Sequence, residues 1–142
     1  MPDLASAVTL QLTYLEQLKL SLESELHLIS SRDAEALITL LQAKEQLLDQ
    51  IRDQDELIAK EYQLVAQAGK LTADIDGLFE QAKELVSQCK YRTEINVKAV
   101  AQGQLRLEHL RHLLLESRAK ESMTYDKSGK TRGPSSTKGT SA

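Results

Sequence analysis

The chain has 142 residues and a net charge of −3, with 41% apolar and 27% charged residues, one cysteine and no tryptophan. Leucine dominates the apolar content and aromatic residues reach only 4%, which favours helices packed on helices over a sheet or a ligand cavity. One cysteine excludes an intramolecular disulfide, and residues 1–10 have neither the pattern of a signal peptide nor that of a membrane span. We therefore expect a cytoplasmic, all-α protein with one core, formed by residues 1–118, and no stable membrane insertion.

The first predicted helix covers about residues 3–29. Its apolar residues recur three and four apart, which is the spacing of one helix face, with Gln11 as an interruption. They are Leu4, Val8, Leu15, Leu18, Leu22, Leu26 and Ile29. Pro2 and Asp3 suit a helix start, and residues 30–33 form a short connection in which Ser31 or Asp33 can cap the next helix.

The second predicted helix covers residues 33–67 and has the same spacing. Its stripe contains Leu37, Leu41, Leu48, Ile51, Ile58, Tyr62 and Val65. The short connection makes the first two helices antiparallel. Gly69 then predicts the helix end, and Thr72 predicts a cap for a third helix.

The third predicted helix covers residues 72–117 and completes an up-down-up three-helix antiparallel bundle, or coiled coil. Its apolar stripe keeps the spacing of three and four residues from Ile75 to Leu114. At about 1.5 Å per residue this helix spans roughly 65–70 Å, longer than either companion. We expect its last turns to project and to expose a binding surface for a partner. That surface consists of Leu107, Leu110, Leu113 and Leu114. The alternative is that the same leucines are covered within the chain or in a homodimer.

Polar residues occupy five positions on the predicted helix seams. They are Lys44, Asp55, Thr93, Asn96 and Gly103. Polar seam residues commonly fix the register of a helical bundle at some loss of stability. The alternative is a loose third helix between Thr93 and Gly103 that can repack around a partner, and continuity through Gly103 is left open.

Residues 119–142 are predicted to form a flexible polar tail. Nine of these 24 residues are Ser or Thr and three are Gly, so the segment cannot bury enough surface to fold alone. The tail carries five basic and two acidic residues, which leaves −6 on residues 1–118. The acidic body argues against nucleic-acid binding. Tyr125 stands out as an aromatic anchor for a partner.

No motif predicts an enzyme, a cofactor or a metal site. His109 and His112 share a helix face with Glu108 and Glu116, but neighbouring arginines oppose a cation there, so we interpret it as a solvated, salt-bridged face. Residues 128–131 (Ser-Gly-Lys-Thr) match only the end of a phosphate-binding loop, without the strand or the following helix that such a loop requires.

The size, the helical layout and several short motifs resemble the FlgN family of flagellar type III export chaperones. The motifs are the Lys44, Leu47, Leu48 pattern, the stretch around Asn96, and Met123-Thr124-Tyr125 followed by Gly129. Such family members often have glycine directly after the tyrosine, where this chain has Asp126. The resemblance covers nearly the whole chain.

The resemblance implies a cytoplasmic chaperone that binds the hook-filament junction proteins, prevents their premature assembly and delivers them to the export gate. By resemblance, Tyr125 and Gly129 contact the gate, with Asn96 as a second match, and the export ATPase components are further partners. We expect the leucines of the third helix to bind the client and a client-free chain to be able to dimerise. A coiled-coil scaffold or tethering subunit, and a secreted export substrate, are the alternative readings.

Overall fold

A computed structural model describes residues 3–102 and 108–124, which form four α-helices. The helices are α1 (Leu4–Ser31), α2 (Ala34–Gln67), α3 (Ala73–Ala101) and α4 (Glu108–Thr124). The described residues contain no strand, which confirms the all-α prediction. No helix in the described part of the chain is long and apolar enough to cross a membrane.

Side-chain caps set the starts of the first three helices. Asp3 accepts a hydrogen bond from the Ser6 amide at 2.7 Å, Asp33 from the Ala36 amide and Thr72 from the Ile75 amide. Each cap satisfies one of the amides that open a helix and have no partner within it. Gly69 follows α2 with φ of +68°, a conformation that glycine adopts without a steric penalty. The α1–α2 connection is only Arg32 and Asp33, shorter than expected.

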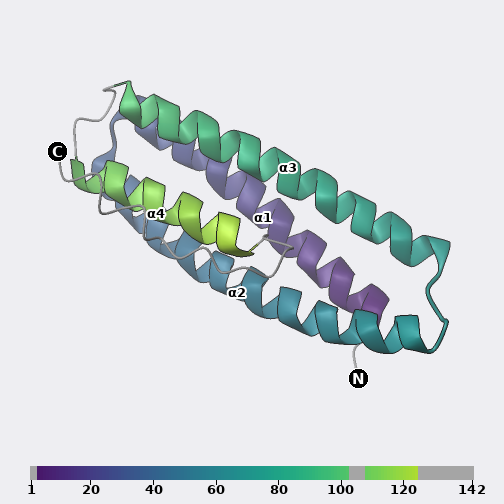
Figure 1. Cartoon of the computed structure of the whole chain (residues 1–142). Helices are drawn as coiled ribbons and strands as arrows, with labels where there is room; N and C mark the ends of the chain where they lie inside the picture. Colours follow the sequence, from purple (N-terminus) through teal and green to yellow (C-terminus); the bar gives the residue numbers. More distant parts are fainter. Residues whose placement is uncertain (1–2, 103–107, 125–142) are drawn as a thin grey trace.

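Helix α1 is the central element of the first three helices. Its Gln11 side chain donates to the Ile51 carbonyl and Gln54 donates to the Ala7 carbonyl, so α1 and α2 run in opposite directions. The Asn96 side chain donates to the Leu22 carbonyl, and Cys89 lies against the Leu15 carbonyl, so α1 and α3 run in the same direction. No Cα atom of α2 lies within 8 Å of one of α3. Figure 1 shows the two helices on either side of α1.

The core forms three successive clusters along the bundle. The cluster near the α2–α3 connection contains Leu4, Ala7, Val8 and Ile58. The central cluster contains Leu15, Leu18, Leu22, Leu48, Ile51 and Cys89. The cluster near the α1–α2 connection contains Ile29, Leu37, Leu41, Ala99, Val100 and Leu114. The predicted stripes of α1 and α2 therefore supply most of the core.

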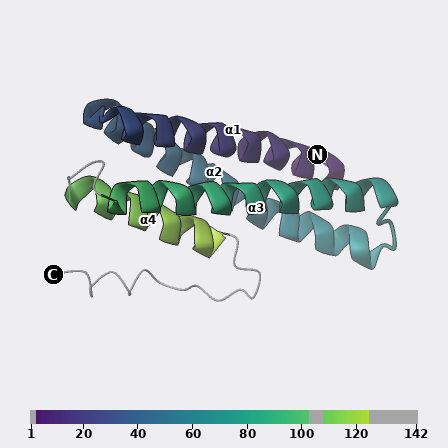
Figure 2. The same ribbon diagram turned by 90° about the horizontal axis from the view of Figure 1, so that it is seen from above.

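The prediction of one long third helix, residues 72–117, is wrong. Helix α3 ends at Ala101, and α4 runs back along it on the side of the bundle away from α1, between α2 and α3 (Figures 1 and 2). Gly103, one of two glycines in this stretch, falls between the two helices, in a segment outside the described residues. Folding back buries Leu114, which a projecting helix would expose to water. Residues 119–124, expected in the tail, belong to α4.

Candidate functional site

Helix α4 lies on a face formed by α2 and α3, close to the α1–α2 connection (Figure 1). Among its residues 111–121, whose side chains are described, three are buried: Leu114, Ser117 and Glu121. Their spacing of three and four places them on one side of the helix. In this part of α4 the inner side is therefore narrow, and two of the three buried residues are polar.

Leu114 provides the apolar contact of α4 with the bundle. It is 2% exposed and belongs to the cluster with Leu37, Leu41 and Val100. Leu113 is partly buried and packs against the same cluster. These two residues of the predicted client-binding surface are thus covered within the chain, because α4 reverses direction instead of projecting. Leu107 and the side chain of Leu110 lie outside the described part of the chain.

A buried polar cluster lies one to two turns further along α4. Both carboxylate oxygens of Glu121 lie 3.0 Å from the Thr93 hydroxyl oxygen, which also lies 2.9 Å from the Cys89 carbonyl. Lys44 and Glu25 form an ion pair at 2.8 Å between Nζ and Oε1, and their side chains are 0% and 1% exposed. Three charged residues from α1, α2 and α4 therefore lie in the interior, and two of them are acidic.

Burial raises the pKa of Glu121 from 4.5 to about 7, since the interior solvates a carboxylate poorly. Attraction to Lys44 and the hydrogen bond with Thr93 oppose this rise, and repulsion by Glu25 adds to it. One lysine cannot offset two carboxylates completely, and it already pairs with Glu25. Glu121 is therefore an unfavourable anchor for α4 when it is ionised.

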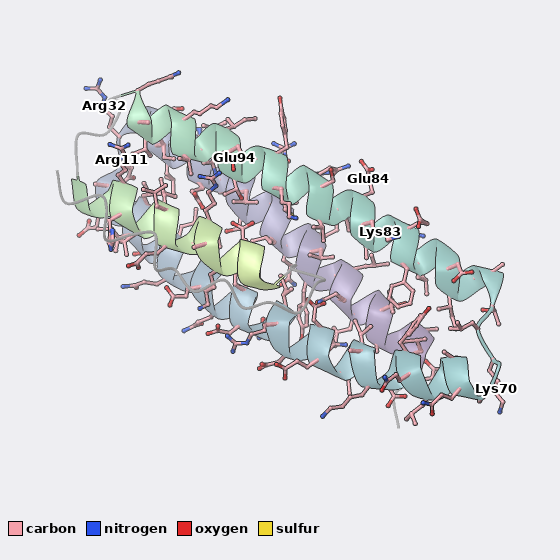
Figure 3. The ribbon with its side chains drawn as sticks, in the orientation of Figure 1. Arg32, Lys70, Lys83, Glu84, Glu94 and Arg111 are labelled. Carbon is pink, nitrogen blue, oxygen red and sulfur yellow. The ribbon has the colours of Figure 1, made fainter. Side chains whose placement is uncertain are left out.

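Ion pairs on the surface flank the buried cluster. Arg118 of α4 pairs with Glu94 of α3, which is labelled in Figure 3, and Lys120 pairs with Asp49 of α2 at 2.8 Å. The hydrogen bond from Lys120 lowers the pKa of Asp49. Exposed ion pairs of this kind contribute about 1 kcal/mol or less to stability, so they help to orient α4 but add little to the stability of its docking.

The residues predicted to contact the export gate are not brought together in the described part of the chain. Asn96 is 1% exposed, and its amide donates to the Leu22 carbonyl at 3.0 Å, so its side chain joins α3 to α1 and is not accessible to a partner. Tyr125 and Gly129 lie outside the described residues. Residues 128–131, with their partial phosphate-loop pattern, lie outside as well.

The other polar seam residues also make contacts between helices. Lys44 pairs with Glu25, Thr93 meets Glu121, and Asp55 accepts a hydrogen bond from Gln11 at 2.6 Å. These contacts favour the interpretation that polar seam residues fix the register of the helices. Sequence reasoning missed Glu25 and Glu121. A lysine on an apolar seam signals a buried counter-charge, and that signal points to Glu25 on the antiparallel neighbour.

A groove of about 490 Å³ lies between α1 and α2, and it is lined by Ser, Gln, Leu and Ala residues and by Lys44. No carboxylate, imidazole or thiol belongs to its lining. Elsewhere, His112 pairs with Glu116 at 2.7 Å on the half-exposed side of α4. Among the described residues, no three His, Cys, Asp or Glu side chains are grouped to hold a metal ion.

Comparison with known proteins places the chain in a family. The model of the FlgN protein family matches residues 1–133, a span that includes all four helices. The chain matches no curated protein and no solved structure. FlgN proteins are chaperones of flagellum assembly that serve type III export. The chain therefore belongs to the FlgN family of flagellar export chaperones.

Proposed function

We propose that this chain is a cytoplasmic chaperone for the hook-filament junction proteins of the flagellum, which prevents their premature assembly and delivers them to the export gate. The family match supports the chaperone role, and the resemblance of the sequence motifs supports these clients. The proposed action requires no cofactor and no catalysis, because capture and release are reversible binding equilibria.

The client site in this proposal is α4 together with the face that it covers. The observation that supports it is the way residues 111–121 of α4, the part with described side chains, dock on a mainly apolar face: one leucine and two polar residues are buried there. A helix held in this way can leave its place and offer Leu107, Leu110, Leu113 and Leu114 to a helical segment of the client. The exposure of such residues drives association because their burial removes apolar surface from water.

Delivery is assigned to the segment after α4. Tyr125 and Gly129 are the proposed gate contacts, on the basis of their resemblance to the family motif. Asn96 is left out of this proposal, since its side chain is buried between α3 and α1. Export ATPase components are proposed as further partners, and homodimerisation through α4 is proposed for the client-free chain.

The test is direct binding of the purified full-length chain to purified hook-filament junction proteins, with flagellin as the comparison. We expect a stable complex with a junction protein and weaker binding of flagellin. Replacing both Leu110 and Leu113 by Asp should abolish capture while circular dichroism shows unchanged helicity. A stable homo-oligomer in light scattering, with no binding of any junction protein, would instead support the scaffold alternative.

A further inference from the structure

The face beneath α4 is much more apolar than the helix that covers it. It presents Leu37 and Leu41 from α2 and Ala99 and Val100 from α3, with Ile29 of α1 in the same cluster. All five are buried while α4 is in place. An apolar face of this kind is stabilised by whichever helix excludes water from it.

Among residues 111–121 of α4, whose side chains are described, one of the three buried positions is apolar like this face and two are polar. Leu114, Ser117 and Glu121 occupy positions i, i+3 and i+7, and the carboxylate of Glu121 enters an interior that already contains the paired Glu25 and Lys44. Burial of a second carboxylate next to a single lysine is unfavourable. At these two polar positions α4 thus docks more weakly than an apolar helix would.

We propose that α4 is a removable occupant of this face, and that an amphipathic helix of the client, with apolar residues at i, i+3 and i+7, takes its place. The client helix and the docked α4 exclude each other. This inference rests on the proposed function, since the client is the hook-filament junction protein. We propose a helix because the position that α4 leaves accommodates one helix. We propose that its inner residues are apolar because apolar residues line that position.

The polar cluster accepts an apolar residue in the place of Glu121. Without Glu121 the Thr93 hydroxyl keeps its hydrogen bond to the Cys89 carbonyl, and Lys44 keeps its ion pair with Glu25. No buried polar group loses its last partner, so removing the carboxylate brings no desolvation penalty. A leucine at this position of a competing helix therefore binds better than the resident glutamate.

The experiment compares two leucine substitutions in the full-length chain. Glu121→Leu improves the docking of α4, whereas Glu116→Leu makes the same chemical change on the outer side of α4, where the side chain is half-exposed. With purified monomeric junction protein as the probe, we expect Glu121→Leu to weaken binding about tenfold or more and Glu116→Leu to leave it within about twofold. Hydrogen exchange should show slower exchange of the α4 amides in Glu121→Leu alone.

A second variant moves the equilibrium in the opposite direction. Ser117→Asp introduces a charge at a buried position, which releases α4 but keeps all its leucines. Client binding should tighten about fivefold, with faster exchange in α4 and unchanged exchange in α1. If Ser117→Asp unfolds the bundle, the two leucine variants decide the question.

The outcomes separate this inference from the proposed function. Absence of any complex between the wild-type chain and a junction protein would remove the proposed function, and the inference with it. A wild-type complex of normal affinity, with Glu121→Leu binding as well as Glu116→Leu or more tightly, would overturn only the exclusion of the client by α4.

Discussion

Glu121 of α4 meets Thr93 of α3 through both carboxylate oxygens, each 3.0 Å from the threonine hydroxyl oxygen. This contact joins the C-terminal helix to the bundle in the interior, next to the Glu25–Lys44 pair. Its strength depends on the protonation of one buried carboxylate, and that dependence can be measured.

The stability of α4 docking should fall as pH rises from about 4.5 to about 7. Docking raises the pKa of Glu121 from 4.5 to about 7, so the docked state holds its proton where the free helix has lost it. The stabilisation is complete below pH 4.5 and decreases by about 1.4 kcal/mol per pH unit, about 3 kcal/mol in all, until pH 7. Hydrogen exchange of α4 or thermal melting between pH 5 and 8 measures this slope.

The matched variants are Glu121→Gln, which should abolish the slope, and Glu116→Gln on the outer side of α4, which should retain it. The groups that face Glu121 are Glu25 of α1, Lys44 of α2, and Cys89, Lys90 and Thr93 of α3. Asp49 acts with the opposite sign, because its pKa is lowered from 3.8, and its effect lies below this range. An equal slope in wild type and Glu121→Gln would refute the assignment.

Lys44→Met should be strongly destabilising. It leaves Glu25 buried without its counter-charge, and breaking a buried pair from one side typically reduces the free energy of unfolding by about 3–5 kcal/mol. The double variant Lys44→Met, Glu25→Leu should recover most of that loss, because Glu25 is no longer buried without a counter-charge and Glu121 loses the attraction of Lys44 and the repulsion of Glu25 together. Urea unfolding checks both, with Lys83→Met of the exposed Lys83–Glu80 pair as a control that should change stability by about 0.5 kcal/mol or less.

Asn96→Ala should reduce stability and leave gate binding unchanged. Loss of the hydrogen bond to the Leu22 carbonyl should lower the free energy of unfolding by about 1–2 kcal/mol. Binding to the purified cytoplasmic part of the export gate, at a temperature where both chains are folded, should be equal for wild type and variant. A loss of affinity in the folded variant would mean that Asn96 contacts the gate after all.

Tyr125→Ala should weaken binding to the gate by about tenfold and leave client binding intact, since a tyrosine anchor commonly supplies that much of an interface. Tyr91→Ala is the matched control, because Tyr91 of α3 is 69% exposed and carries no proposed contact. Isothermal titration with each partner measures the two affinities separately. Equal losses for gate and client would contradict the division between tail and helix.

Cys89 should be unreactive in the folded chain. Burial raises the pKa of its thiol to about 12, so only about one part in 10⁴ is thiolate at pH 8. Labelling by Ellman's reagent should be slow in buffer and fast in urea, and the single cysteine makes the readout unambiguous. Fast labelling under native conditions would show that the α1–α3 contact opens readily.

The sequence was sufficient to predict helix type and the limits of the first two helices, because caps and periodicity agreed there. Asp33, Gly69 and Thr72 each act locally, and their roles follow from residue type. The end of α3 was missed because the apolar period continues from Val100 to Leu114, and period alone cannot distinguish a continuous helix from one that reverses.

The candidate site was predicted only in part. Leu113 and Leu114 were identified as important apolar residues, but their burial depends on the direction of α4, which is a tertiary property. Glu121 had no signal, since it was assigned to a polar tail and its burial requires α3 beside it. Lys44 was recognised as a seam residue, whereas its pairing with Glu25 depends on the register between α1 and α2.

The central position of α1 also shapes how the chain reaches its native state. Helices α1 and α2 form a local hairpin across two residues, whereas α3 returns to α1 through contacts 74 residues apart in the chain. Closing that long loop costs more conformational entropy than forming the hairpin, and it is therefore slower. During synthesis one side of α1 in the hairpin therefore stays uncovered until the residues of α3 have left the ribosome.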